Sequence, residues 1–298
     1  MYLCNITADA IMKGTDTKYI NVNGRLMDLS SPCVMGILNL TPDSFYAGSR
    51  KQTETEIIAR AGAILAEGGA IIDVGACSSR PGADLPTAKE EMERLRRGLS
   101  LLRRELPEEA VLSVDTFRAD VARMCVEEYG VAIVNDIAGG AMDEEMFPTI
   151  ARLGVPYILM HMQGTPQDMQ QQPHYEQVVC EVMMYFAERV QRLHEAGVKD
   201  VVLDPGFGFG KTLEHNYRLL AHLDAFSLFN LPLLVGFSRK SMISKLLGGT
   251  AEEALNGTTV LNTIALQKGA SILRVHDVRE AAEAVRIYRA MQQQVPFV

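Results

Sequence analysis

The chain has 298 residues, of which 47% are hydrophobic and 22% are charged. This composition is sufficient to bury a core and excludes a globally disordered protein. A formal net charge of −8 argues against nucleic acid as a partner, because nucleic-acid binding needs a basic surface.

The first 33 residues differ in pattern from the rest and are interpreted as an N-terminal extension. Within residues 19–30, two short alternating runs flank Asn23-Gly24, a dipeptide that favours the type I′ turn of a β-hairpin. We expect this hairpin to precede the main domain and to close its bottom, with the first dozen residues poorly ordered.

Residues 34–298 repeat one pattern, in which a short apolar run is followed by a polar loop and an amphipathic helix. Near-continuous apolar runs are typical of strands buried on both faces of a parallel sheet. Eight such strands alternating with helices predict an α/β protein with one (β/α)8 TIM barrel, and a doubly wound open sheet is the alternative. The strand candidates are Val34–Asn39, Ile71–Gly75, Val111–Asp115, Val131–Asn135, Pro156–His161, Val201–Asp204, Leu233–Phe237 and Ser271–Val275.

Two of the expected helices carry capping signals. Thr53 with Glu56, and Thr87 with Glu90, have the spacing of a capping box. Gly68-Gly69 is expected to end the first of these helices. Further helices are predicted after Thr116, Met142 and Thr212, and over Tyr175–Ala196 and Val278–Met291.

Acceptor side chains stand at the ends of three predicted strands. In a TIM barrel the active site lies at the carboxyl ends of the strands, so Asp115, Asn135 and Asp204 would meet at one mouth. Such groups suit a flat heterocycle rich in N–H donors, because only matched hydrogen bonds offset the burial of polar atoms.

Cationic or potentially cationic residues follow other strands. Arg80, Lys240, Arg274 and His276 suit a phosphate or diphosphate, to which arginine offers a bidentate fork. Together the two sets predict a substrate with a polar ring at one end and an anionic group at the other.

Each residue taken alone also permits a simpler interpretation. An aspartate at a strand end is often a helix N-cap, Arg80 could lie on a surface loop, and His161 could be a satisfied core histidine. The glycine-rich string at 206–210 resembles a phosphate loop but fits neither GxGxxG nor GxxxxGKS.

Seven strings, taken in order, resemble the signatures of the dihydropteroate synthase family. They are MGILNLTPDSF (Met35–Phe45), DVGACSSRPGA (Asp73–Ala83), SVDT (Ser113–Thr116), NDI (Asn135–Ile137), DPGFGFGK (Asp204–Lys211), GFSRKS (Gly236–Ser241) and RVHDV (Arg274–Val278). The second string departs from the GGESTRPG common in the family, since Ala76, Cys77 and Ser79 replace Gly, Glu and Thr. The departure puts in doubt the contacts of that loop and leaves the implied reaction unaffected.

The resemblance implies a transferase of folate biosynthesis and a sulfonamide target. The enzyme would condense 4-aminobenzoate with 7,8-dihydropterin-6-ylmethyl diphosphate, giving 7,8-dihydropteroate and diphosphate, with Mg²⁺ as cofactor and a homodimer as the assembly. The alternatives are a pterin-dependent methyltransferase on the same barrel and a non-catalytic pterin-binding paralogue. Cytoplasmic localisation is expected, because the N-terminus lacks a signal peptide, no membrane span is present and the five cysteines form no CxxC pair.

The resemblance also implies roles for individual residues. The pterin ring would be held by Asp115, Asn135, Asp204 and Lys240. The diphosphate would be bound by Arg274, His276 and Asn39, of which Asn39 would also meet Mg²⁺. A second loop carrying Ser79 and Arg80 would help to close the site. The 4-aminobenzoate pocket would contain Phe45, Phe209 and Ser241, and the residues expected to carry catalysis are Asp115, Asp204, Lys240 and Arg274.

Overall fold

A single closed barrel forms the body of the protein in the computed structural model, which describes residues 18–40, 50–77 and 85–293. Its eight strands are β3 (Cys33–Asn39), β4 (Ile71–Gly75), β5 (Val111–Asp115), β6 (Ile133–Asp136), β7 (Tyr157–Met160), β8 (Val201–Asp204), β9 (Leu234–Val235) and β10 (Ile272–Val275). All pair in parallel in the order β8-β7-β6-β5-β4-β3-β10-β9. A parallel bridge between Leu203 and Leu233 joins the two ends of this order. The predicted TIM barrel is thus confirmed, and the open-sheet alternative is wrong.

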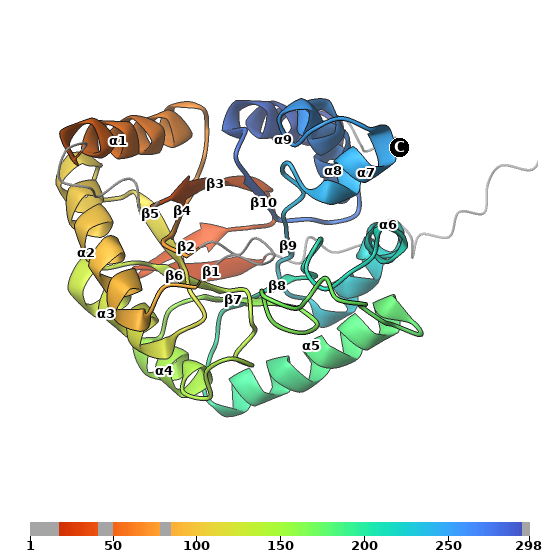
Figure 1. Ribbon diagram of the computed structural model, residues 1–298, viewed down its shortest axis with the longest axis horizontal. Helices are drawn as coiled ribbons and strands as arrows, with labels where there is room; N and C mark the ends of the chain where they lie inside the picture. Colours follow the sequence, from red (N-terminus) through yellow and green to blue (C-terminus); the bar gives the residue numbers. More distant parts are fainter. Residues whose placement is uncertain (1–17, 41–49, 78–84, 294–298) are drawn as a thin grey trace, which may run out of the picture.

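Helices surround the strands, as Figure 1 shows for the ring that runs from α1 to α9. They are α1 (Arg50–Ala66), α2 (Ala88–Glu105), α3 (Ala119–Tyr129), α4 (Met146–Leu153), α5 (Val178–Glu195), α6 (Leu213–Ala221), α7 (Ser241–Leu247), α8 (Leu255–Gln267) and α9 (Val278–Gln293), with short 3-10 turns η3 (Leu223–Phe229) and η4 (Glu252–Ala254). Among the helices described, none has the length and hydropathy of a membrane span.

One of the two predicted capping boxes is present. Thr87 accepts a hydrogen bond from the Glu90 backbone, and the Glu90 carboxylate accepts one from the Thr87 backbone at 2.8 Å. The other prediction is wrong, because α1 begins at Arg50 and Thr53 lies inside the helix. A threonine three residues before a glutamate also fits a helix interior, where the two positions share one face.

The N-terminal hairpin closes the bottom of the barrel, as predicted. β1 (Tyr19–Val22) and β2 (Arg25–Asp28) are antiparallel, and their turn places Asn23 at φ 51° and Gly24 at φ 79°. Positive φ at both residues is what a type I′ turn requires. Ile20, Val22 and Leu29 of this segment are buried in one apolar cluster with the amino-terminal ends of the barrel strands.

The barrel interior changes from apolar to polar within two residues. Alternate side chains of a strand point inward, so the interior is filled in layers. The lower layer contains Ile71, Ile133, Ile158, Val202, Leu234 and Ile272. Two residues further along these or neighbouring strands, the next inward positions hold Asp73, Ser113, Asn135, Asp204 and Arg274. The apolar layer stabilises the barrel, and the polar layer opens toward the carboxyl ends of the strands.

Candidate active site

Arg274 on β10 is the centre of the polar layer. Its Nε donates to Oδ2 of Asp73 on β4 at 2.7 Å, and its Nη2 donates to Oδ2 of Asp115 on β5 at 2.7 Å. Burial disfavours the charge of Arg274, but the two carboxylates outweigh it and raise the pKa of the guanidinium. One cation therefore fixes two carboxylates inside the barrel.

Several polar atoms of this layer have no partner among the described residues. The Asn135 amide donates Nδ2–H to Asp73 Oδ2 at 3.0 Å. Its Oδ1 is buried without a hydrogen bond, as are Asp73 Oδ1 and Ser113 Oγ. An unpaired polar atom in a protein interior is costly, so these positions suit a ligand that brings its own donors.

Asp204 ends β8 at the same mouth. Its Oδ1 accepts the backbone N–H of Gly206 at 2.8 Å, which fixes the carboxylate at the start of the next loop. Burial raises the pKa of Asp204, and the nearby charges of Lys240 and Arg274 oppose this rise. Asp115, Asn135 and Asp204 thus share one polar interior, as the sequence predicted.

Lys240 reaches this interior because the chain leaves the sheet soon after β9. Arg239 adopts φ 58°, and the Lys240 backbone N–H donates to Phe237 O at 3.0 Å in a tight turn. The Lys240 ammonium donates to the carbonyl oxygen of Phe207 and lies 4.6 Å from the Phe209 ring centroid. Burial lowers the pKa of Lys240 to about 8, against the attraction of Asp204.

His276 and Asn39 stand at the ends of neighbouring strands. Burial, followed by the charge of Arg274, lowers the pKa of His276 to about 4. Its imidazole is therefore neutral at pH 7, so of the residues grouped as cationic or potentially cationic, His276 is a neutral one. A Cβ at Gly75 would lie 3.6 Å from Asn39 Oδ1 and 3.5 Å from Asp115 Cβ, so the side chains of Asn39 and Asp115 both lie next to this glycine.

Four predicted site residues add less to this picture. Ser241 is exposed at the first residue of α7, beside Lys240 in the chain. Phe45, Ser79 and Arg80 lie outside the described residues.

Cys77, part of the departure in the second string, is half-buried. Arg118 Nη1 lies 3.8 Å from its sulfur, and burial raises the pKa of the thiol. A thiol of raised pKa is a poor nucleophile, so Cys77 is a weak candidate for covalent catalysis.

Two important residues were not assigned a role from the sequence. Asp73 is fully buried and holds both Arg274 and Asn135. Its signal is an aspartate within the apolar run Ile71–Gly75, where an inward charge needs a buried partner. Lys211 is the other, and its surroundings could not be foreseen.

The buried side chain of Lys211 stabilises the loop after β8 by hydrogen bonds to its backbone. Its ammonium donates to the carbonyl oxygens of Gly206 and Phe209 and to His161 Nδ1, each at 2.9 Å. Burial and the Lys211 charge lower the pKa of His161 to about 2, so this ring accepts as a neutral group. His161 is thus a satisfied core histidine, the simpler of its two interpretations.

Lys211→Met is expected to lower the free energy of unfolding by about 1–3 kcal/mol, because four acceptors, including His161 O at 3.3 Å, lose their donor. Urea unfolding measures this change. The control is Lys268→Met, which removes a bond of 2.8 Å to Ala221 O and an exposed ion pair of 3.2 Å with Asp224, and should cost less than about 1 kcal/mol. Equal losses in both variants would contradict a clamping role for Lys211.

The acidity of Asp115 predicts how activity depends on pH. Burial raises its pKa to about 7, with Arg274 opposing and Asp73 reinforcing the rise. Below that pH the carboxyl of Asp115 is protonated and no longer attracts Arg274, or a donor group of a ligand, by its charge. We expect kcat/KM to fall as pH is lowered through about 7, and a profile that is flat from about pH 5 to about pH 8 would contradict this.

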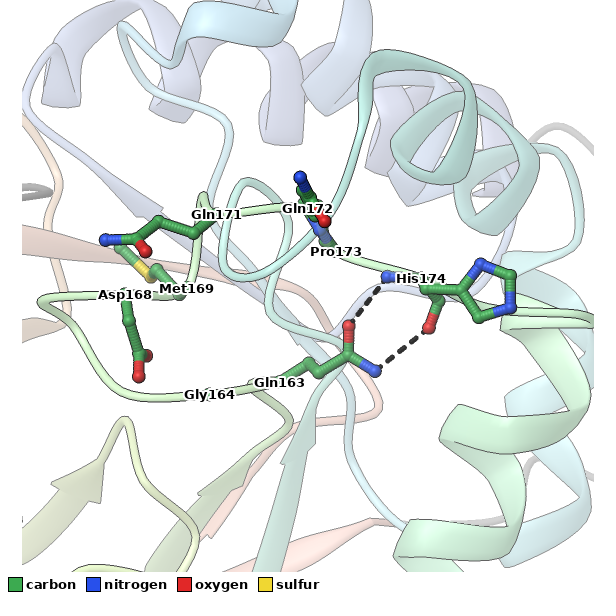
Figure 2. A pocket seen from close by; sticks show the side chains of 8 residues that line it. All are labelled: Gln163, Gly164, Asp168, Met169, Gln171, Gln172, Pro173 and His174. Atoms are coloured by element: carbon green, nitrogen blue, oxygen red, sulfur yellow. Dashed lines mark hydrogen bonds between the residues drawn. The ribbon is translucent and has the colours of Figure 1, made fainter.

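A cavity of about 360 Å³ lies in the loop after β7 and is shown in Figure 2. The Gln163 side chain closes this loop by donating to His174 O at 2.9 Å and accepting from His174 N at 3.0 Å. None of the predicted substrate-binding residues that the structure describes lines it. The cavity therefore lies apart from the polar layer of the barrel.

Comparisons with known proteins show the family of the chain. The family model described as pterin binding enzyme matches residues 35–276. Dihydropteroate synthase of Escherichia coli strain K12 is 44% identical over 273 residues, covering 90% of this chain and 94% of the relative. The Haemophilus influenzae dihydropteroate synthase is 37% identical over 270 residues, covering 90% and 97%.

Solved structures match over nearly the whole described barrel. The Yersinia pestis dihydropteroate synthase, in a complex with a sulfonamide drug, has a TM-score of 0.84 and 39% identity, covering 92% of this chain and 99% of that chain. The Xanthomonas albilineans dihydropteroate synthase with 4-aminobenzoic acid has a TM-score of 0.84 and 36% identity, covering 94% and 100%. By its sequence, its barrel and its relatives, the chain belongs to the dihydropteroate synthase family of pterin-binding enzymes.

Proposed function

We infer that the chain catalyses the reaction of its family, the transfer of a dihydropterin methylene from diphosphate to 4-aminobenzoate. The observation that carries this inference is the Arg274 guanidinium held between Asp73 and Asp115, beside polar atoms that lack a partner. The barrel interior thus holds both hydrogen-bond acceptors for the pterin ring and a guanidinium for the diphosphate.

The ring end of the substrate would lie against the carboxylates. We propose that Asp115, Asp204 and Asn135 hydrogen-bond the N–H groups of the pterin, with Lys240 beside them. As the bond between the methylene and the diphosphate oxygen breaks, the ring shares the developing positive charge. Ionised carboxylates placed there in advance stabilise that charge in the transition state.

The leaving diphosphate would lie toward Arg274, His276 and Asn39, with Ser79 and Arg80 joining from the second loop. Its oxygen takes the electron pair of the broken C–O bond, so donors aimed at it lower the barrier. The amine nitrogen of 4-aminobenzoate then forms the C–N bond and loses one proton. An aromatic amine is already neutral at pH 7, so positioning rather than a strong base is required.

The 4-aminobenzoate would lie on the side of Lys240 and Phe209, whose ring already meets that ammonium at 4.6 Å. Ser241, which follows Lys240, and Phe45 are proposed to complete this pocket. The relative from Yersinia pestis was solved with a sulfonamide drug. We propose that the same pocket of this chain accepts sulfonamides.

We also propose Mg²⁺ as the cofactor. The described residues hold no cluster of three or more His, Cys, Asp or Glu side chains. A hard cation bound by one amide oxygen, waters and substrate phosphates needs no such cluster, and the exposed Asn39 offers an oxygen beside Asp115. Bound there with the substrate, Mg²⁺ would neutralise charge on the diphosphate.

Two alternatives fit the site less well. A pterin-dependent methyltransferase would use the carboxylates but would need no donors for a diphosphate, and Arg274 and His276 provide them. A non-catalytic paralogue would be expected to lose Arg274 or Lys240, and both are present in the polar layer.

Diphosphate release by the purified protein decides among these functions. We expect release only when the pterin diphosphate and 4-aminobenzoate are both present, with dihydropteroate formed in equal amount. Release without 4-aminobenzoate, or no release with both substrates, would overturn the proposed reaction.

A homodimer is the proposed assembly. Six large apolar side chains are exposed on the consecutive helices α7, α8 and α9, which lie together in Figure 1. They are Leu246, Leu247, Leu255, Val260, Ile287 and Met291. Such a concentration suits an interface between copies. Light scattering should give twice the chain mass, and Val260→Asp should shift it toward the monomer; a wild-type monomer would contradict the proposal.

We propose the cytoplasm as the compartment. Cys33, Cys77, Cys125 and Cys180 are free thiols in the described part of the chain. Reduced cysteines of this kind agree with a reducing environment.

A further inference from the structure

Ser238 and His276 form a closed pair at the mouth of the barrel. The backbone N–H of His276 donates to Ser238 Oγ at 3.1 Å. The same oxygen lies 3.1 Å from Nδ1 of the His276 ring. Ser238 is buried, with 6% of its surface exposed, so its hydroxyl depends on these partners.

The number of protons available to Ser238 and His276 determines whether Nδ1 of the imidazole carries a proton. A serine hydroxyl has one proton to donate, and one of its acceptor sites is filled here by the His276 backbone. These are the two hydrogen bonds of Ser238 Oγ within the described residues. If Nδ1 carried a proton, the buried hydroxyl proton would have no acceptor, which is costly. With Nδ1 unprotonated, every member of the pair is satisfied.

The groups that face His276 favour the same neutral form. Arg274 lies on its own strand, Arg239 comes from the turn after β9, and Arg60 of α1 donates to the His276 carbonyl oxygen at 2.5 Å. Asp277 is the opposing charge, and it is engaged by Arg239 through bonds of 3.2 and 2.6 Å. Three guanidinium groups around one ring disfavour a fourth positive charge.

We propose that Ser238 is a positioning residue that holds His276 as the neutral tautomer with its proton on Nε2. The ring then presents one fixed N–H on the edge opposite Ser238. Given the proposed function, that N–H donates to an oxygen of the leaving diphosphate. His276 therefore acts as a hydrogen-bond donor, and the positive charge at this end of the site comes from arginine.

The tautomer is read directly by ¹⁵N NMR of the labelled full-length protein, independently of any activity. The chain has six histidines, so the His276 signals are assigned by their loss in His276→Gln. We expect an unprotonated Nδ1 and a protonated Nε2 at pH 7. In Ser238→Ala the loss of the hydroxyl should mix the two tautomers and raise the pKa of the ring. A protonated Nδ1 in the wild type, or an unchanged spectrum in Ser238→Ala, would overturn the proposal.

Kinetics then test whether Ser238 acts through His276. Ser238→Ala should lower kcat for diphosphate release about tenfold and leave KM for 4-aminobenzoate within about twofold. In a His276→Gln background the same substitution should change kcat less than about twofold. Ser244→Ala on α7, whose hydroxyl is 3.4 Å from Ser241 O, is the control and should leave kcat unchanged.

An equal loss from Ser238→Ala in both backgrounds would show that Ser238 acts through the fold and would overturn the positioning role. If wild-type protein releases no diphosphate, the proposed reaction fails, while the NMR result still decides the tautomer.

Discussion

Arg274→Met is expected to lower kcat/KM for diphosphate release by about a thousandfold or more. The guanidinium makes two charged hydrogen bonds of 2.7 Å, to Asp73 and Asp115. Its removal leaves two carboxylates of the barrel interior without their cation and deprives the leaving group of a donor. Loss of a preorganised donor to a developing oxyanion alone costs roughly a hundredfold to a thousandfold.

The matched control for this substitution is Arg96→Met. Arg96 also makes two bonds to a carboxylate, at 3.1 and 2.7 Å to Glu128, but it lies on the surface with 45% of its side chain exposed. A surface ion pair contributes less than about 1 kcal/mol, so activity should stay within about twofold. Retention of more than a tenth of the activity in Arg274→Met would contradict its central role.

Asp204→Asn is expected to lower kcat at least about a hundredfold with little loss of folded protein. The amide oxygen can still accept the 2.8 Å bond from the Gly206 backbone, so the loop after β8 keeps its anchor. What disappears is the negative charge that would stabilise the cationic ring in the transition state. Binding of the ring should also weaken by about 1–3 kcal/mol, as its N–H meets a less favourable partner.

Asp200→Asn is the control, because Asp200 lies just before the opposite end of β8, where it accepts from the Asn21 backbone at 3.3 Å. It should leave kcat within about twofold. Wild-type turnover in Asp204→Asn, measured alongside this control, would remove Asp204 from the site.

Much of the barrel could be predicted because each of its strands is a short, nearly continuous run of apolar residues. β4, β5 and β8 begin and end where the apolar runs do, since both faces of each strand are buried. β9 is shorter than the run Leu233–Phe237, because the chain turns away toward Lys240. The start of α1 was missed, since its first residues carry no signal that distinguishes the cap from the helix interior.

The meeting of several strand-end residues at one mouth could be predicted, but Asp73 was missed and the pairing of the residues could not be predicted. Strand ends place Asp115, Asn135 and Asp204 at one mouth whatever the loops do. Which carboxylates Arg274 reaches depends on the closure of the barrel, which brings β10 within reach of β4 and β5. The neutral state of His276 follows from burial and from Arg274, which is close in sequence, but also from Arg239 and Arg60 on other elements, which sequence alone does not bring near.

The central claim is that one side of the barrel mouth recognises the ring and the other recognises the diphosphate. Calorimetry with two separate ligands, a pterin that lacks phosphate and inorganic diphosphate with Mg²⁺, tests it on two variants. The account predicts that Asp204→Asn weakens binding of the pterin about tenfold or more and leaves binding of diphosphate within about twofold. For His276→Gln it predicts that binding of diphosphate weakens about tenfold or more and that binding of the pterin stays within about twofold. Equal weakening of both ligands in both variants would contradict the division of the site.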